Sequence, residues 1–358
     1  MKKKLLFFSI LLLSIVNSNS QNASNGLNRI MDGVREAYEL DGISVAVIET
    51  ERIFYGISGI PNTILSDTAI LKSKIHLGSL SKTITSFVAM KMVEDGVLSL
   101  QDKVGAVIPE LSGIGNSNSI SLEDLLKNTS EVNNFNKEKD FKKVINLSGS
   151  ASVKMLEIAK VALDKKGDDD EFSNAAYVIA ALMIERAAKA PFDELVRKVV
   201  EDDLKLSGYT TLPDKNGLTN FWGSWADSSA QIAHFATNSF LNNDYMMPAD
   251  GISMDIVDYS KFLQMQLNGI LGDSNYLNYS TYNKIHFENE GFGLGWKNAD
   301  ENGYRVSFHD NQSNSYFFHS VIIPNYKIAV IVMAQLKDAS AVDGVYELTN
   351  KLVSNYTK

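Results

Sequence analysis

The sequence predicts an α/β (α+β) protein: an antiparallel sheet flanked by helices from both chain ends, with an inserted helical lobe. Strand-like segments with a turn between them occur early, at residues 43–49 and 53–59. Further strand-like segments occur late, between residues 291 and 334. Helical periodicity fills most of the intervening chain. Because strands need a common sheet and helices need a face to cover, the two ends are expected to meet in one sheet.

The sheet side is predicted from short apolar runs bounded by turn residues. A helix over Leu27–Leu40 ends at Asp41-Gly42, and a hairpin of Ile43–Glu49 with Ile53–Gly59 follows. A last helix is expected at 341–354, so the first and last helices would cover the sheet. The late strands are expected at Gly291–Trp296, Tyr304–Phe308, Tyr316–Ile323 and Ile328–Ala334.

The middle of the chain is predicted to be mostly helical. One helix begins at Ser79 and runs to about Asp95-Gly96. Residues 21–358 are expected to form a single domain, with a sheet lobe at about 21–85 and 290–358 and a helical lobe at about 86–289. A cleft between two lobes is the default place for an active site. Further helices are expected at Leu122–Lys127, Ala151–Leu163, Ala175–Lys189, Phe192–Leu206 and Asp255–Leu267.

Residues 1–20 are typical of a secretory signal peptide. The chain opens on three lysines, continues with a short apolar run, and carries small residues at Ser18 and Ser20 before the expected cut. The apolar run is too short for a confident membrane span. The mature chain is therefore expected to be periplasmic or secreted, without a membrane span, although an uncleaved amphipathic anchor is an alternative.

Composition excludes several classes of function. The chain has no cysteine, so disulfides, thiol catalysis and thiolate metal sites are ruled out. A formal charge of −9 argues against nucleic acid, since phosphate binding needs a basic patch. The histidines show no metal-ligand spacing, and neither metal nor cofactor is expected. The expected partner is a small-molecule or peptide substrate, and the chain is expected to be a monomer.

Ser79 and Lys82 stand three positions apart at the head of an apolar helix. On a helix, positions i and i+3 share a face, so the ammonium can reach the hydroxyl. A serine hydroxyl needs an adjacent base, and a lysine withdrawn from water can be one because desolvation lowers its pKa. The alternative interpretation is a helix-capping serine beside a surface lysine, because the Ser-x-x-Lys spacing often occurs by chance.

Several segments, taken in order, resemble the serine β-lactamase-related family, and the chain looks like a divergent member. This is the group of class C β-lactamases, D-alanyl-D-alanine carboxypeptidases, D-aminopeptidases and family VIII esterases. The likeness covers essentially the whole mature chain. The segments that carry it are Ile75–Ser86, Lys91–Val104, Ile108–Leu111, Phe172–Tyr177, Phe292–Trp296 and Phe308–Asn311.

The resemblance implies an acyl-enzyme mechanism. Ser79 would attack a carbonyl and Lys82 would take or relay its proton. The oxyanion would lie between the backbone N–H groups of Ser79 and Gln312. Asn174 would donate its amide to the substrate and hold Lys82. The implied activity is that of an exported serine hydrolase, esterase-like or peptidase-like, that cleaves an ester or an amide.

Four places depart from the family pattern, and one of them is the segment Asn128–Glu131, which replaces the family's His-Thr-Ser-Gly. Phe172 stands where the family has tyrosine, so a phenol that can serve as a proton relay is missing. His309 replaces a lysine, and an imidazole is expected to bind a substrate carboxylate more weakly than an ammonium would. Asn311 replaces a glycine and is expected to narrow the cleft or to re-aim the N–H of Gln312. Poor activity on β-lactams is therefore expected.

The departures leave other functions open. The chain could be a catalytically impaired family member that binds a peptidoglycan-like fragment or a peptide. It could also transfer the acyl group to an acceptor other than water. Four acids at 168–171, just before Phe172, would favour neutral or amine-bearing substrates if they lie at the cleft rim. A solvated loop is the simpler interpretation of that run.

Overall fold

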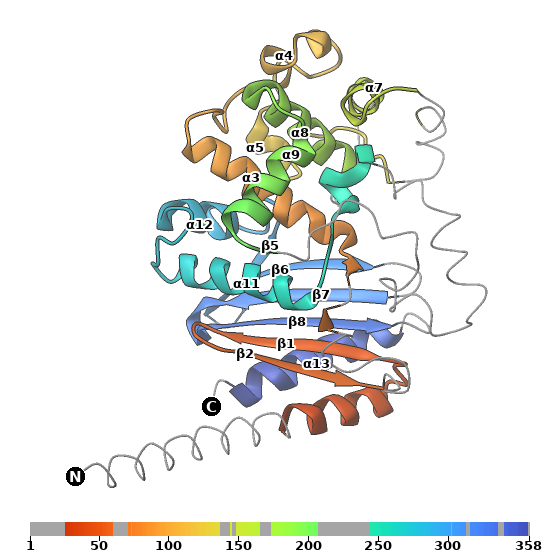
Figure 1. Cartoon of the computed structure of the whole chain (residues 1–358), viewed down its shortest axis with the longest axis vertical. Helices are drawn as coiled ribbons and strands as arrows, with labels where there is room; N and C mark the ends of the chain where they lie inside the picture. Colours follow the sequence, from red (N-terminus) through yellow and green to blue (C-terminus); the bar gives the residue numbers. More distant parts are fainter. Residues whose placement is uncertain are drawn as a thin grey trace.

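The two ends of the chain meet in one antiparallel sheet, as the sequence predicts. The computed structural model describes residues 26–59, 71–72, 74–136, 144, 148–164, 173–206, 244–301, 303–312, 316–335 and 340–356. Among these, six strands pair in the order β2-β1-β8-β7-β6-β5 (Figure 1). They are β1 (Ile43–Glu49), β2 (Ile53–Ser58), β5 (Lys297–Glu301), β6 (Tyr304–Gln312), β7 (Tyr316–Ile323) and β8 (Ile328–Gln335).

Alternation along the strands builds a core on each face of the sheet. In β1, Ile43, Val45 and Val47 pack toward a helix at residues 26–37 and toward α13 (Ser340–Tyr356). Ala46 and Ile48 point to the opposite face and join the larger core beneath the other helices. Because side chains alternate along a strand, one apolar run serves two cores. Figure 1 shows the two terminal helices together below the sheet.

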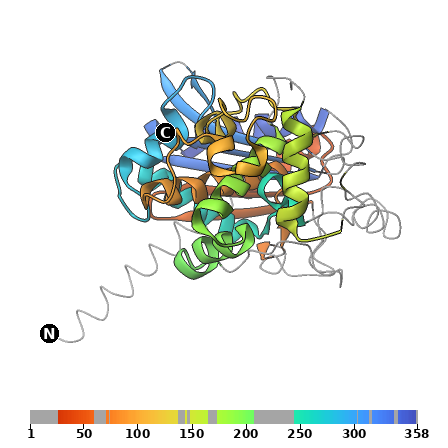
Figure 2. The same ribbon diagram turned by 90° about the horizontal axis from the view of Figure 1, so that it is seen from above.

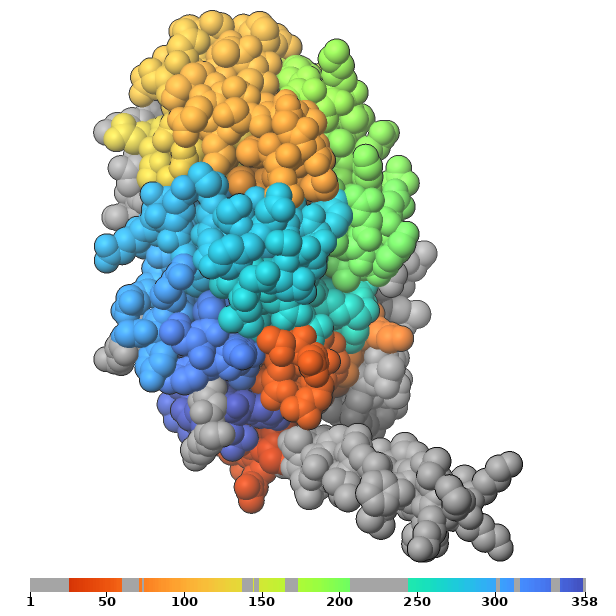
Figure 3. Space-filling view, turned by 90° about the vertical axis from the view of Figure 1, so that its left-hand side faces the viewer, coloured from red at the N-terminus to blue at the C-terminus, as the bar shows by residue number. Residues whose placement is uncertain are grey.

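The helices between the strands form a second body above the sheet (Figures 1 and 2). The space-filling view shows residues of about 253–290 as the part of that body that lies next to the strands (Figure 3). A small second sheet pairs β3 (Ile75–His76) with β4 (Ser253–Met254). The helices are α3 (Ser81–Glu94), α4 (Val104–Val107), α5 (Leu122–Leu126), α7 (Ala151–Leu163), α8 (Asn174–Ala188), α9 (Phe192–Arg197), α11 (Ile256–Ile270) and α12 (Tyr279–Phe287). Short turns of helix are η1 (Gly78–Leu80), η2 (Pro109–Leu111), η3 (Lys198–Asp203), η5 (Asp244–Met246), η6 (Met247–Gly251) and η7 (Pro324–Tyr326).

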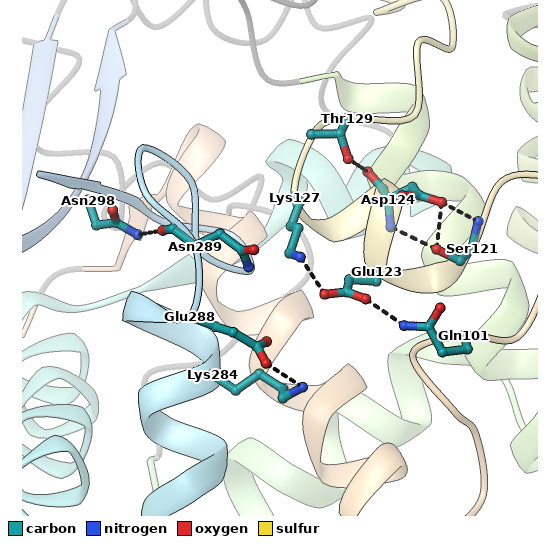
Figure 4. Close-up of polar contacts among 10 residues, drawn as sticks. All are labelled: Gln101, Ser121, Glu123, Asp124, Lys127, Thr129, Lys284, Glu288, Asn289 and Asn298. Atoms are coloured by element: carbon teal, nitrogen blue, oxygen red, sulfur yellow. Dashed lines mark hydrogen bonds and ion pairs between the residues drawn. The ribbon is translucent and has the colours of Figure 1, made fainter.

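The helix α5 is held at its start by the side chains of Ser121 and Asp124 (Figure 4), and at its end by contacts to a backbone carbonyl. Ser121 and Asp124 form a capping box, in which each side chain satisfies an N–H of the other residue. At the other end, the carbonyl of Leu126 accepts from the N–H of Gly295 at 3.1 Å. The same carbonyl accepts from the hydroxyl of Tyr177 at 2.8 Å. This carbonyl therefore joins α5, α8 and the loop before β5.

Two details of the sequence prediction are wrong. The segment Gly291–Trp296 is not a strand, because Gly291 and Gly295 both have positive φ, 85° and 79°, and turn the backbone; β5 begins only at Lys297. The helix expected to begin at Ser79 begins at Ser81, because Ser79 lies in the tighter turn η1. Within the described chain, no helix has the length and apolar character to cross a membrane. The expected signal peptide lies outside the described residues.

Candidate active site

Ser79 and Lys82 are in direct contact. Ser79 lies in η1, which leads without interruption into α3, and its side chain is half-buried. The ammonium nitrogen of Lys82 donates to the Ser79 hydroxyl oxygen at 2.9 Å. The alternative of a surface lysine is wrong, since Lys82 is fully buried. A half-buried hydroxyl beside a buried amine is the arrangement that nucleophilic catalysis by serine requires.

Lys82 has three acceptors, one for each hydrogen of an ammonium. Besides Ser79, its Nζ donates to the side-chain oxygen of Asn174 at 2.8 Å and to the carbonyl of Ala249 at 2.8 Å. Burial lowers the pKa of Lys82 from 10.5 to about 8, and the nearby charge of Asp250 opposes that shift. The amine therefore changes its protonation state close to neutral pH, where a general base is most useful.

The contact to Ala249 depends on η6, which lies against the start of α3. The hydroxyl of Thr85 donates to the Pro248 carbonyl at 2.7 Å. The N–H of Ile252 donates to the Ser81 hydroxyl at 3.0 Å. Sequence reasoning missed this segment. Its only sequence mark is an acid, Asp250, in an otherwise apolar run that begins with two methionines.

Asn174 reaches Lys82 because the start of α8 is held from outside the helix. The Ser173 hydroxyl caps α8 by accepting from the N–H of Ala176 at 3.1 Å. The N–H of Ser173 donates to the side chain of Asn128 at 2.7 Å. Asn128, one of the positions that depart from the family pattern, thus positions the residue before Asn174. Phe172 and the acids at 168–171 lie outside the described residues.

Three nearby hydroxyls, those of Ser81, Ser173 and Tyr177, each have a hydrogen-bond partner other than Ser79. The Ser81 and Ser173 hydroxyls, which could relay a proton in place of the missing phenol, are engaged by Ile252 and Ala176. The ring of Tyr177 lies 5.8 Å from the Lys82 nitrogen, but its hydroxyl donates to Leu126. Burial raises the pKa of this phenol above its usual value.

The strand β6 brings His309 and Asn311 to the side of the sheet that faces Ser79. The side-chain oxygen of Asn311 accepts from the backbone N–H of Ser79 at 3.0 Å. That N–H is one of the two donors expected to bind the oxyanion, and in this structure an internal carboxamide occupies it. The expectation that Asn311 would narrow the cleft or re-aim Gln312 missed this contact. Gln312 is the last residue of β6, where its backbone lies opposite Phe317.

Gly78 makes the close approach of Asn311 possible. Its φ is +57°, and a Cβ added there would lie 2.3 Å from the Asn311 side-chain nitrogen. Only glycine accommodates both the backbone conformation and the neighbouring amide. The contact between β6 and η1 therefore depends on a residue of each element: Asn311 supplies the carboxamide, and Gly78 leaves room for it.

His309 is a buried neutral group. Its exposed fraction is 1%, and its Nδ1 donates to the Gly295 carbonyl at 2.8 Å. Burial, reinforced by the charge of Lys82, lowers the pKa of this imidazole to about 3. His309 is therefore not a surface histidine. Because the ring is uncharged at neutral pH, it offers a substrate carboxylate no cation.

The residue between His309 and Asn311 faces the other side of the sheet. Asp310 accepts from His319 at 2.6 Å and from the Tyr346 hydroxyl of α13 at 3.2 Å. Of the other histidines, His286 bonds to Ser307 and Gln266, which agrees with a structural role. His234 lies outside the described residues.

Replacing His309 by Asn is expected to make the protein less sensitive to acid. The Asn side-chain nitrogen can keep the hydrogen bond to Gly295 but cannot be protonated. With a folded pKa of about 3 and an unfolded value of 6.5, the unfolded wild-type chain binds one more proton between these limits, so its stability falls as the pH falls.

Urea unfolding at pH 6.5 and pH 5.5 checks this. The free energy of unfolding of the variant, relative to wild type, should improve by about 1.0 kcal/mol over that unit, because the unfolded imidazole is already half protonated at pH 6.5. A relative stability that is the same at both pH values would show that His309 is not buried in its neutral form.

The side chains of Ser79, Lys82 and Asn174 thus meet in one hydrogen-bonded group, in which the Ser79 hydroxyl is half-buried and the other two side chains are buried. A model of the beta-lactamase family matches residues 27–350. The chain therefore belongs to the beta-lactamase family, and the resemblance noted in the sequence is confirmed. A search of curated protein sequences found no match.

Solved structures with the same fold are only distantly similar in sequence. One is a beta-lactamase/D-alanine carboxypeptidase from Yersinia pestis complexed with citrate, with a TM-score of 0.69 and 16% identity over 93% of this chain and 99% of that one. Another is a D-stereospecific amidohydrolase from Streptomyces sp., with a TM-score of 0.64 and 17% identity over 92% and 97%. An octameric penicillin-binding protein homologue from Pyrococcus abyssi has a TM-score of 0.66 and 18% identity over 89% and 75%.

These likenesses establish the mixed α/β fold with its antiparallel sheet. The relatives are named as hydrolases or as a penicillin-binding homologue, and one of them is octameric. A monomeric state for this chain therefore stays a prediction.

Proposed function

We propose that the protein is a serine hydrolase that cleaves an ester or an amide through an acyl-enzyme on Ser79. The observation that supports this best is the 2.9 Å contact between the Ser79 hydroxyl and a fully buried lysine. Since burial brings the pKa of that lysine to about 8, a useful fraction of it is neutral at working pH.

In the proposed reaction, neutral Lys82 removes the hydroxyl proton as the Ser79 oxygen bonds to the substrate carbonyl carbon. The carbonyl oxygen becomes an oxyanion, and the family resemblance assigns the N–H groups of Ser79 and Gln312 as its donors. The bond to the leaving group then breaks, and the Lys82 ammonium returns the proton to the departing oxygen or nitrogen. Water attacks the acyl-enzyme by the same route, with Lys82 again as base.

A burst experiment with p-nitrophenyl acetate tests this proposal. Acylation should release one p-nitrophenolate per protein molecule before slower turnover begins. The burst rate should rise with pH and reach half its maximum near pH 8, because only neutral Lys82 can accept the proton. Absence of a burst between pH 6 and 10 would contradict the proposal.

A second candidate is an impaired member that binds a ligand without efficient turnover. The observation that favours it is the occupied N–H of Ser79, which is not free to receive an oxyanion. Acyl transfer to an acceptor other than water follows the same first steps. Export to the periplasm or the medium is part of the proposal and rests on the signal-like residues 1–20.

β-Lactams are expected to be poor substrates. Penicillins and cephalosporins carry a carboxylate, and the uncharged His309 gives it no ionic partner. The side chain of Asn311 occupies the N–H that the lactam carbonyl oxygen would need, but an ester carbonyl meets the same obstacle, so the expected difference between the two substrates rests on His309. We expect kcat/KM for nitrocefin and ampicillin at least about tenfold below that for p-nitrophenyl acetate, equivalent to about 1.4 kcal/mol of transition-state binding. A kcat/KM for either β-lactam that equals or exceeds the value for p-nitrophenyl acetate would refute this account of His309.

A further inference from the structure

Lys82 has a buried acid as a neighbour. Asp250 is 7% exposed and follows Ala249, whose carbonyl accepts from Lys82 at 2.8 Å. The backbone on both sides of Asp250 is held to α3, by Thr85 through Pro248 and by Ser81 through Ile252. The backbone that carries the acid is thereby held beside the lysine by contacts that do not involve the Asp250 side chain.

The groups that surround Lys82 differ in charge. Three of these groups are neutral: Ser79 from η1, and Asn174 and the ring of Tyr177 from α8. Among the described residues, Asp250 is the acid whose charge acts on Lys82; burial raises the pKa of Asp250 itself, and the charges of His76 and Lys82 oppose that rise. His309 from β6 and His76 from β3 are the nearby bases, and burial lowers the pKa of each, so both are neutral at pH 7.

A buried ammonium without a counter-charge is costly, whereas a buried pair is tolerated. Three dipolar acceptors satisfy the hydrogens of Lys82 but do not neutralise its charge. We propose that Asp250 is the counter-charge of Lys82, a positioning residue that fixes how readily this lysine takes and holds the proton of Ser79. The proposal concerns the base of the reaction set out above and rests on that function.

The direction of the effect follows from charge. Asp250 favours the protonated form of Lys82, so its loss should lower the pKa of the lysine. With a pKa near 8, about one tenth of Lys82 is neutral at pH 7; a fall of about one unit would raise this to about one half. Asp250→Asn should therefore speed acylation at pH 7 by about fivefold and move the half-maximum of the burst rate down by about one pH unit.

A direct titration of Lys82 separates this proposal from the proposed function. In the full chain labelled with 13C-lysine, the Cε resonance of Lys82 is identified by its loss in Lys82→Met. Its midpoint should lie near pH 8 in wild type and about one unit lower in Asp250→Asn. The control Asp244→Asn, which removes an exposed acid just before η6, should leave it unchanged.

A midpoint that stays the same or rises in Asp250→Asn would overturn the pairing. If wild type shows no burst but the midpoint falls as expected, the pair stands and the hydrolase proposal fails. If Asp250→Asn does not fold, Lys82→Met supplies the reciprocal test. Loss of the ammonium should raise the pKa of Asp250, which is measured from the carboxyl resonance in protein labelled with 13C-aspartate. An unchanged pKa of Asp250 would overturn the proposal.

Discussion

Ser79→Ala is expected to abolish the burst and the turnover of p-nitrophenyl acetate. The Ser79 oxygen carries the acyl group in the proposed reaction, and alanine has no atom to replace it. Loss of a nucleophile that works as a unit with its base costs on the order of 10⁶ in kcat in a well-studied serine hydrolase. The measurement is the release of p-nitrophenolate by equal amounts of folded wild type and variant.

The fold should survive this change. The Ser79 side chain is half-buried, and its contact with Lys82 is a single hydrogen bond. Its removal leaves Lys82 with two acceptors, a loss of about 1–3 kcal/mol in the free energy of unfolding. Thermal unfolding checks that the variant is native. Unchanged turnover in native Ser79→Ala would refute the mechanism.

Asn311→Gly is expected to raise the rate of acylation by about 10- to 1000-fold. The Asn311 oxygen accepts from the Ser79 N–H, so a substrate carbonyl must displace it before the oxyanion can be bound. Displacement of one neutral hydrogen bond costs up to about 1.5 kcal/mol, or about tenfold in rate. If the Asn311 side chain stays in place, the Ser79 N–H cannot donate to the oxyanion. The rate of acylation then falls by about 10²- to 10³-fold.

Asn311→Ala is the matched control for backbone freedom. It removes the carboxamide without the flexibility that glycine adds to a strand. Both variants should acylate faster than wild type if the carboxamide is the obstacle. A rate that falls in both would show that Asn311 assists the reaction, for example as an oxyanion donor through its side-chain nitrogen.

The Ser79–Lys82 contact could be predicted because it is local. Two residues three apart on one helical face meet whatever the rest of the chain does. Asn174 could be found only through the order of motifs, since it meets Lys82 across 92 positions of sequence. The two-faced sheet could likewise be predicted, because alternation along β1 and β8 assigns each side chain to a face.

What the sequence did not reveal depends on tertiary placement. Ala249 meets Lys82 across 167 positions, and the contact is made by a backbone carbonyl, which carries no side-chain signature. The contact of Asn311 with the Ser79 N–H requires the register of β6 against η1. The burial of His309, which makes it neutral, follows from packing around Gly295 and Lys82 rather than from its motif.

The central claim is that Ser79 is the nucleophile, and covalent labelling tests it most directly. The full chain is treated with a fluorophosphonate, its mass is measured, and the adduct is located by peptide mapping. We expect one phosphonyl group per chain, bonded to the Ser79 oxygen with loss of fluoride, formed faster at pH 9 than at pH 6. An adduct on another residue, or none on native protein at pH 9, would contradict the account.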